Sequence, residues 1–317
     1  MEMRSLGSSG LEVSRLGFGA WQLGGHGWGD CDQDHMVQAV RAAVDNGINF
    51  FDTADVYGLG ESERQLSKAL GSQRHDVVIA TKFGVRWNQQ KETRKDISPE
   101  YLVGTLEESL RRLRIERIPL YYVHWPDGRT PIEEAMAALV RQRDAGKIAA
   151  IGISNFSAAE IRAAAEVTEI AAVQMQFSLI NREVVEQVLP TLEELNIPLV
   201  AWGALTKGLL SGKFSPQTQF PDNDTRHRDP DFLGVRFLSN LKVADGLKTL
   251  STRLGRSPAQ IAIRWLLDSP GTTAVLAGAK TTAQVRENCQ ACGWQLSEDD
   301  YQFLEHLADD ARSPTAD

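Results

Sequence analysis

Residues 49–58, NFFDTADVYG, form a short apolar run that ends in polar residues. This is the pattern of a buried strand whose last residues reach a surface. Five further stretches repeat it: 77-VVIATK, 118-IPLYYVHWPD, 148-IAAIGISN, 171-AAVQMQFS and 198-PLVAWGA. Helix-forming sequence fills most of the gaps between them. Strands that alternate with helices in this way predict an α/β fold, a (β/α)8 TIM barrel, in preference to an open sheet.

The polar residues at the strand ends indicate proton-transfer chemistry. In a parallel barrel the C-terminal ends of all strands face one mouth, so residues scattered along the chain converge there. The residues concerned are Asp52, Tyr57, Lys82, His124, Ser154, Asn155, Gln174 and Trp202. Together they supply an acid, a phenol, an amine and an imidazole, which are the groups that general acid–base catalysis uses.

Size and composition favour one cytoplasmic barrel domain. A barrel takes roughly 250 residues and more with insertions, so we expect residues 1–317 to form a single domain. The net charge of −8 argues against binding to nucleic acid or to an anionic membrane. The first ten residues, MEMRSLGSSG, lack the apolar core of a signal peptide. No apolar run approaches the ~20 residues that span a bilayer.

The cysteines and histidines predict no metal site. Cys289 and Cys292 form a lone CxxC, and Cys31 is far away in sequence, whereas a structural zinc site needs four ligands. An odd number of cysteines in a chain this long is no disulfide framework and indicates a reducing compartment. The histidines show no HExxH spacing, and only His124 follows a strand.

Two segments depart from the alternation of strands and helices. Residues 3–19 predict a β-hairpin around Ser8-Ser9-Gly10, which precedes the first barrel strand and caps the bottom of the barrel. Residues 213–239 follow the strand at 198 and are polar, proline-rich and almost without periodicity. A loop of this length in a compact domain is usually functional or disordered.

Prolines mark several helix boundaries. Ser98–Pro99 and Thr130–Pro131 each predict an N-cap followed by the first helical residue. Pro190 predicts an interruption or kink in a helix over residues 183–196.

The glycine-rich residues 17–29, GFGAWQLGGHGWG, do not make a Rossmann fingerprint. After Gly17 and Gly19, the third glycine position of G-x-G-x-x-G is Gln22, and the stretch lies too early for a βαβ unit. A better anion site lies where Gly278 ends the last strand, because Lys280 then opens a helix. From these residues alone, a solvated lysine beside an ordinary turn is an equally good interpretation.

The chain resembles the aldo-keto reductase family over roughly residues 3–308. The motifs that carry the resemblance are 50-FFDTADVYGLGESE, 79-IATK, 122-YVHWPD, 146-GKIAAIGISNF, 202-WGALTKGLLSGK and 278-GAKTTAQVREN. It is most similar to the bacterial branch related to potassium-channel β subunits and to general-stress-type members. The resemblance implies a barrel with a long cofactor loop after strand 7, and NADP(H)-dependent reduction of aldehydes or ketones to alcohols.

The resemblance also implies a catalytic tetrad of Asp52, Tyr57, Lys82 and His124. Tyr57 would donate the proton that the carbonyl oxygen needs after hydride transfer. Lys82 would lower the phenol pKa by stabilising the phenolate, and Asp52 would orient Lys82 and keep it charged. His124 would hydrogen-bond the carbonyl oxygen and position the substrate.

Further positions match the family's cofactor and substrate contacts. The implied cofactor residues are Gly19, Ala20, Trp21, Asp52, Ser154, Asn155, Gln174, Trp202, Gly203, Ala204, Leu205, Lys207, Gly208, Lys213, Arg226, Gly278, Lys280, Gln284, Glu287 and Asn288. Many relatives have Tyr followed by Ser where this chain has Trp202 and Gly203, and stacking on the nicotinamide should survive that change. Trp21, Tyr57, Trp87, His124 and Trp125 would line an apolar or aromatic carbonyl pocket.

Two other classes of function compete with a free-standing reductase. The resemblance to channel β subunits allows a cofactor-binding redox sensor or interaction protein with slow turnover. A metal-dependent barrel enzyme would need clustered ligands at strand ends, and only His124 and Asp52 are candidates. The expected partner is a small carbonyl or alcohol substrate, and the expected assembly a monomer or weak oligomer.

Overall fold

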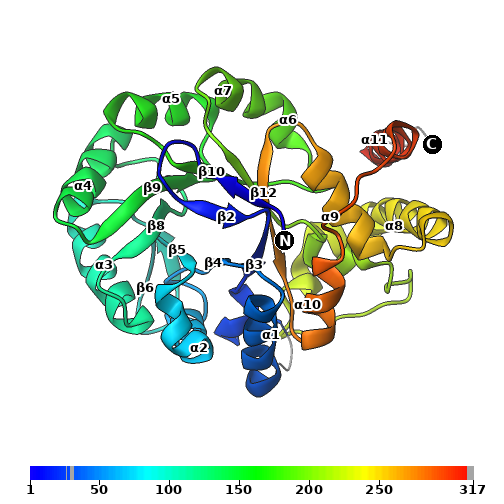
Figure 1. Ribbon diagram of the computed structural model, residues 1–317, viewed down its shortest axis with the longest axis horizontal. Helices are drawn as coiled ribbons and strands as arrows, with labels where there is room; N and C mark the ends of the chain where they lie inside the picture. Colours follow the sequence, from blue (N-terminus) through cyan, green and yellow to red (C-terminus); the bar gives the residue numbers. More distant parts are fainter. Residues whose placement is uncertain (26, 29–31, 313–317) are drawn as a thin grey trace.

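The computed structural model describes residues 1–25, 27–28 and 32–312, and within them eight parallel strands close into a barrel (Figure 1). In chain order these strands are β3 (Leu16–Gly19), β4 (Phe50–Asp52), β5 (Val78–Phe83), β8 (Ile118–Val123), β9 (Ile148–Ser154), β10 (Ala172–Gln176), β11 (Leu199–Trp202) and β12 (Thr272–Gly278). Neighbouring strands follow the chain order, and β12 closes the ring by pairing with β3. The predicted TIM barrel is confirmed.

Helices surround the barrel and connect its strands (Figure 1). They are α1 (Gln33–Asp45), α2 (Glu61–Leu70), α3 (Pro99–Leu113), α4 (Ile132–Asp144), α5 (Ala158–Val167), α6 (Glu183–Gln187), α7 (Leu189–Glu194), α8 (Gly234–Leu254), α9 (Pro258–Asp268), α10 (Thr282–Cys289) and α11 (Glu298–Arg312). Among the described residues, no helix is long and apolar enough to cross a membrane.

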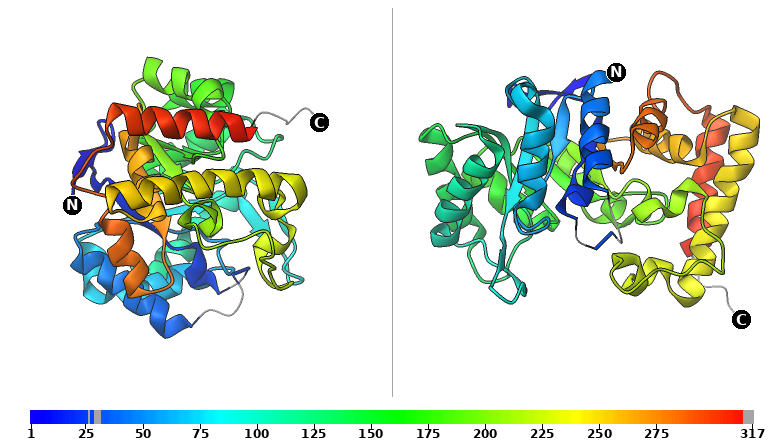
Figure 2. Two further views of the ribbon diagram at one scale, coloured as in Figure 1. Left: turned by 90° about the vertical axis from the view of Figure 1, so that its right-hand side faces the viewer. Right: turned by 90° about the horizontal axis from the view of Figure 1, so that it is seen from below.

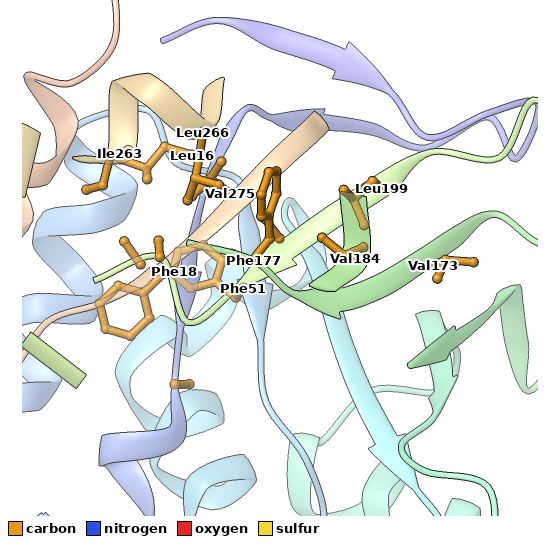
Figure 3. Close-up of a cluster of buried hydrophobic side chains, with 14 of the residues drawn as sticks. Leu16, Phe18, Phe51, Val173, Phe177, Val184, Leu199, Ile263, Leu266 and Val275 are labelled. Carbon is orange, nitrogen blue, oxygen red and sulfur yellow. The ribbon is translucent and has the colours of Figure 1, made fainter. Parts of the chain in front are cut away.

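Alternation along the strands separates an inner core from an outer one. On β4, Phe50 belongs to the cluster inside the barrel and Phe51 to the cluster outside it. Because side chains of a strand alternate between faces, Asp52 points inward again, at the end of the strand. Leu120, Val200 and Ala274 fill the same interior from three other strands. The outer cluster lies between strands and helices, as Phe18, Phe51 and Phe177 do near α9 in Figure 3.

The N-terminal hairpin closes the end of the barrel where the strands begin (Figure 1). Strand β1 (Met3–Ser5) pairs with β2 (Glu12–Ser14), and Leu6 and Val13 are buried in the inner cluster. The backbone N–H of Ser14 donates to the Oδ1 of Asn49 at 2.7 Å, just before β4. The predicted cap is confirmed, but the hairpin is shorter than residues 3–19, because residues 16–19 are the first barrel strand itself.

The helix boundaries that serine, threonine and proline predicted are observed, with one exception at the start of α4. Ser98 is the N-cap of α3 and its hydroxyl accepts from the N–H of Tyr101, as predicted. Helix α4 begins one residue later than predicted: Pro131 is its N-cap, and the Thr130 hydroxyl donates instead to Asp127 at 2.8 Å. The interruption at Pro190 is confirmed, since α6 and α7 are separate helices on either side of Val188.

Two insertions project from the end of the barrel opposite the hairpin cap (Figure 2, right). One is a second hairpin, β6 (Val85–Trp87) with β7 (Thr93–Lys95), which the sequence analysis did not predict. The other follows β11, the seventh barrel strand, and consists of 3₁₀ turns and loops over residues 203–233, called the β11 loop below. The prediction of irregular structure up to residue 239 is wrong at its end, because α8 starts at Gly234.

Candidate active site

A buried ion pair lies at the centre of the mouth. The ammonium of Lys82, on β5, donates to Asp52 Oδ1 at 2.6 Å and to the carbonyl oxygen of Thr53 at 2.8 Å. The amide of Gln174, on β10, donates to the other carboxylate oxygen of Asp52 at 2.8 Å. All three side chains are buried. Asp52 pairs in register with Ala80, two residues before Lys82, so both side chains point to the same inner face of the barrel.

Tyr57 and His124 lie next to this pair. The Lys82 ammonium sits 5.1 Å from the centroid of the Tyr57 ring. The imidazole of His124 meets the phenol edge-on, with ring centroids 5.7 Å apart. Nδ1 of His124 is buried and has no hydrogen-bond partner among the described residues. The structure therefore brings together all four residues, which the sequence placed at three different strand ends.

Burial and mutual charge set the protonation of these groups. Burial raises the pKa of Asp52, although Lys82 and Gln174 oppose the rise. Burial acts to lower the pKa of Lys82, but the neighbouring Asp52 carboxylate raises it above its usual value. Burial, together with the ammonium groups of Lys82 and Lys95, lowers the pKa of His124 well below its usual range, so its imidazole is neutral.

Burial and the Lys82 ammonium act in opposite directions on the pKa of the Tyr57 phenol. Burial raises the pKa of Tyr57 above its usual value, and the Lys82 ammonium opposes that rise without reversing it. Lys82 thus acts on the phenol pKa in the predicted direction, but burial, which the sequence analysis did not weigh, has the larger effect. Since desolvation disfavours the phenolate, Tyr57 keeps its proton at neutral pH.

A polar network continues around the mouth from β9 to β11. The hydroxyl of Ser154 donates to the carbonyl oxygen of Gln174 at 2.9 Å. The amide of Asn155 donates to the carbonyl oxygen of His124, and its Oδ1 accepts from the indole of Trp202 at 3.2 Å. Asn155 has a left-handed backbone, with φ of 62°, which turns its side chain back over the strand ends. The four predicted residues Ser154, Asn155, Gln174 and Trp202 thus form one connected group.

The first barrel strand supplies the next side of the mouth. Gly19 lies in register between Asp52 and Gly278, and the N–H of Ala20 donates to the carbonyl oxygen of Asp52 at 2.8 Å. Gln22 fills the space above Gly278, where a Cβ atom would lie 1.8 Å from the Gln22 Nε2. This packing explains why a glycine ends the last strand.

The β11 loop has an unusual backbone. Gly203, Thr206, Lys207 and Gly208 all have positive φ, so the chain turns sharply as it leaves β11. Ala204 is buried, whereas Leu205 is half-buried and packs against the outer core. The ammonium of Lys207 pairs with Asp229, which ties the start of the loop to its far part.

Cations gather where the β11 loop meets the start of α10. Lys213, Arg226 and Lys280 lie close enough that burial and the charges of Arg226 and Lys280 lower the pKa of Lys213. Asp224 is the carboxylate among them and accepts from Arg226 Nε at 2.8 Å. The N–H of Lys280 donates to Gln284 Oε1 at 2.7 Å. Three cations around one carboxylate leave this place with excess positive charge.

Other predicted residues near α10 lie deeper or make only backbone contacts. Asn288 is buried, and its amide reaches the carbonyl oxygen of Gly278 at 3.5 Å. Glu287 is half-buried, and its carbonyl oxygen accepts from Gln260 at 3.2 Å. Arg228, two residues after Arg226, is exposed.

The β11 loop also contacts the loop that follows β3. The N–H of Thr225 donates to the carbonyl oxygen of Gly27 at 2.9 Å, and Trp28 and Asp224 form an isolated β-bridge. Lys280 donates to the carbonyl oxygen of Trp28 at 2.7 Å. The β11 loop and the loop after β3 therefore meet next to Lys213, Arg226 and Lys280.

Aromatic side chains also line the mouth around Tyr57 and His124. Trp21 stacks on Tyr57 with ring centroids 5.9 Å apart, and Trp125 stacks on His124 at 6.4 Å. Trp87 is half-buried on β6, in the hairpin that the sequence analysis missed. The signal for that hairpin was present: VRW and TRK flank NQQKE, a polar turn that begins with asparagine.

The described residues contain no group of three or more His, Cys, Asp or Glu side chains that could hold a metal ion. Cys289 and Cys292 are free thiols, and burial raises the pKa of Cys289 to about 11. Cys31 lies outside the described residues.

The fold and the centre define a class of protein: a parallel barrel whose mouth holds a buried acid–lysine pair, a protonated phenol and a neutral imidazole. Residues 15–309 match the aldo/keto reductase family. The chain belongs to this family and is an oxidoreductase. Enzymes of the family act on small carbonyl substrates and generally use NAD(P)H.

Known proteins of similar sequence and structure match this chain over nearly its whole length. It is 37% identical over 316 residues to aldo-keto reductase YhdN of Bacillus subtilis, covering 99% of this chain and 95% of that one. It is 33% identical to aldo-keto reductase yakc [NADP(+)] of Schizosaccharomyces pombe, covering 94% and 89%. Among solved structures, the glycerol dehydrogenase AKR11B4 of Gluconobacter oxydans superposes with a TM-score of 0.89 at 35% identity, covering 99% and 98%. The holo form of AKR11C1 of Bacillus halodurans gives 0.82 at 30%, covering 97% and 96%.

Proposed function

We propose that this protein reduces aldehydes or ketones to alcohols with NADPH, and that Tyr57 is the proton donor. The observation that carries the proposal is the Lys82–Asp52 pair, 2.6 Å apart and buried beside the Tyr57 ring. A buried cation next to a phenol stabilises the phenolate that forms as the proton leaves. A stable ion pair alone would not need a phenol and an imidazole facing it.

The bound cofactor would supply a hydride to the carbonyl carbon. Tyr57 would then give its proton to the carbonyl oxygen, and Lys82 would hold the negative charge that remains on the phenol. His124, neutral because of its burial, would donate a hydrogen bond to the same oxygen and orient it. Trp21 and Trp125 would exclude water from both sides of the reacting carbonyl.

The residues around the mouth fit NADP(H). The excess positive charge of Lys213, Arg226 and Lys280 at the start of α10 suits the phosphate groups. Ser154, Asn155 and Gln174 offer hydroxyl and amide groups for a carboxamide, and Trp202 an aromatic face for a nicotinamide. The amides of Asn155 and Gln174 already donate to His124 and Asp52, and these hydrogen bonds would hold the two side chains in place for the cofactor.

Turnover of a generic aldehyde tests the proposal. The purified protein should consume NADPH, followed by its absorbance, in the presence of benzaldehyde and should form benzyl alcohol in equal amount. Tight binding of NADPH without any turnover across a panel of aldehydes and ketones would instead favour a redox sensor.

A further inference from the structure

The β6–β7 hairpin presents two chemically different faces at the mouth. Val85 pairs with Lys95 and Trp87 with Thr93, whereas Arg86 pairs with Arg94 between them. Directly paired residues of an antiparallel hairpin share a face, and alternate residues return to it. Lys95 and Trp87 therefore lie on one face and the two arginines on the other.

The face with Lys95 is the one turned toward the catalytic residues. The Lys95 ammonium lies 4.6 Å from the centroid of the Trp125 ring, and Trp125 stacks on His124. The Lys95 charge also contributes to lowering the pKa of His124, after burial and Lys82. The guanidinium of Arg129 donates to the carbonyl oxygen of Lys95 at 2.8 Å and fixes this end of the hairpin.

The cations of the hairpin differ in how they are neutralised. Arg86 and Arg94 share Asp96 at 3.4 Å and 3.8 Å, and Arg86 also lies over the Tyr101 ring. Lys95 has no carboxylate partner among the residues that the structure describes, although the chain carries a net charge of −8. A lysine held over an aromatic ring beside a catalytic imidazole, without a counter-ion, leaves a positive charge available to a ligand.

We propose that Lys95 selects carbonyl substrates that carry an anionic group, a carboxylate or a phosphate, on the end remote from the carbonyl. This inference rests on the proposed reductase function and adds its substrate class. With the carbonyl between Tyr57 and His124, the body of the substrate lies against Trp125, and its anionic end reaches the Lys95 ammonium. Trp125 orients the ammonium through a cation–π contact, so less side-chain freedom is lost when the ion pair forms.

The kinetic signature of such a residue is specific. The ion pair forms equally in the bound substrate and in the transition state, so it lowers KM and leaves kcat nearly unchanged. An exposed pair of charges typically changes affinity by up to about fivefold. The effect should also weaken with added salt.

The test compares 4-formylbenzoate with its neutral methyl ester, which has a similar shape. In the wild-type protein the anion should have the higher kcat/KM. Lys95→Met should lower that preference about three- to fivefold through KM, Lys95→Arg should retain it, and Lys95→Glu should reverse it. Glyceraldehyde 3-phosphate against glyceraldehyde repeats the comparison for a phosphate and decides which anion Lys95 favours. Quenching of tryptophan fluorescence by 4-formylbenzoate without cofactor measures the same contact independently of turnover.

Lys91→Met is the matched control, because Lys91 is an exposed lysine in the turn of the same hairpin. It should leave the preference unchanged. An anion preference that survives both Lys95→Met and Lys95→Glu, or that falls equally in Lys91→Met, would overturn the role of Lys95. Absence of NADPH-dependent turnover of the neutral ester in the wild-type protein would instead overturn the proposed function.

Discussion

The centre of the mouth and the β11 loop hold their charges in different ways. Asp52, Lys82 and Gln174 sit on barrel strands, are buried, and bond to one another over long separations in sequence. In the β11 loop, Arg226 bonds to Asp224 two residues away, and Lys207 pairs with Asp229. The charges at the centre are held by strands from across the barrel, whereas these charges of the β11 loop are neutralised by partners within the loop. The difference indicates that the centre is preorganised for one geometry, whereas the pairs Arg226–Asp224 and Lys207–Asp229 would survive a displacement of the loop.

Removal of the phenol oxygen should have the largest effect. Tyr57→Phe should lower kcat about 10²–10⁴-fold, the usual contribution of a positioned general acid, while leaving NADPH affinity nearly unchanged. Steady-state kinetics and cofactor titration measure the two quantities. Tyr101→Phe removes a phenol that bonds to the carbonyl oxygen of Val85 and should stay within a few-fold of wild type. Activity of Tyr57→Phe close to that of the control would exclude Tyr57 as the acid.

Breaking the buried pair should cost stability as well as activity. Lys82→Met leaves the Asp52 carboxylate buried without its cation, so the free energy of unfolding should fall by about 3–5 kcal/mol. The double change Lys82→Met with Asp52→Asn should recover part of this loss. Removing the exposed pair Arg162–Glu194, 2.6 Å apart, should cost far less, because solvent screens it. Urea denaturation compares the variants, and equal losses for the two pairs would contradict a preorganised centre.

Changes to the cations beside the β11 loop should alter the affinity for the 2′-phosphate of NADPH rather than the rate of the reaction. Lys280→Ala should weaken NADPH binding about tenfold or somewhat more, the usual value of a hydrogen bond to a charged group, with little effect on NADH. Lys242→Ala, which removes an exposed lysine of α8, should change neither cofactor's dissociation constant. An equal loss for both cofactors in Lys280→Ala would place this lysine away from the 2′-phosphate.

The smallest expected effect is a change in amide hydrogen exchange that occurs in the β11 loop and not at the centre of the mouth. At an NADPH concentration of about ten times Kd, amide hydrogen exchange in residues 203–233 should slow about tenfold, because the cofactor binds the closed loop and must leave before it opens. Amides of β4 and β5 should exchange at the same rate with and without cofactor. Unchanged exchange in the β11 loop would mean that it does not fold over the cofactor.

The parts of the site that lie on strands were predictable because the strand period alone directs them inward. Asp52 follows Phe50 by two residues, so its direction was fixed once Phe50 was assigned to the interior. The rise in the Tyr57 pKa was not predictable, since it depends on how deeply the ring is buried. Nor was the packing of Gln22 on Gly278, because it requires the relative placement of two segments that lie far apart in the sequence.

The pairing of β3 with β12 bears on how this protein folds during synthesis. Leu16 to Gly19 find their neighbours at residues 275–278, so the ring cannot close until almost the whole chain has left the ribosome. Until then both β3 and β11 present unpaired edges, which are prone to associate with other chains. Glu2 contacts Arg264 and the N–H of Gly293, so the β1 hairpin also acquires contacts only after these later residues are made. Contacts this distant in sequence predict slow folding and a dependence on chaperones that the stable, closed barrel no longer has.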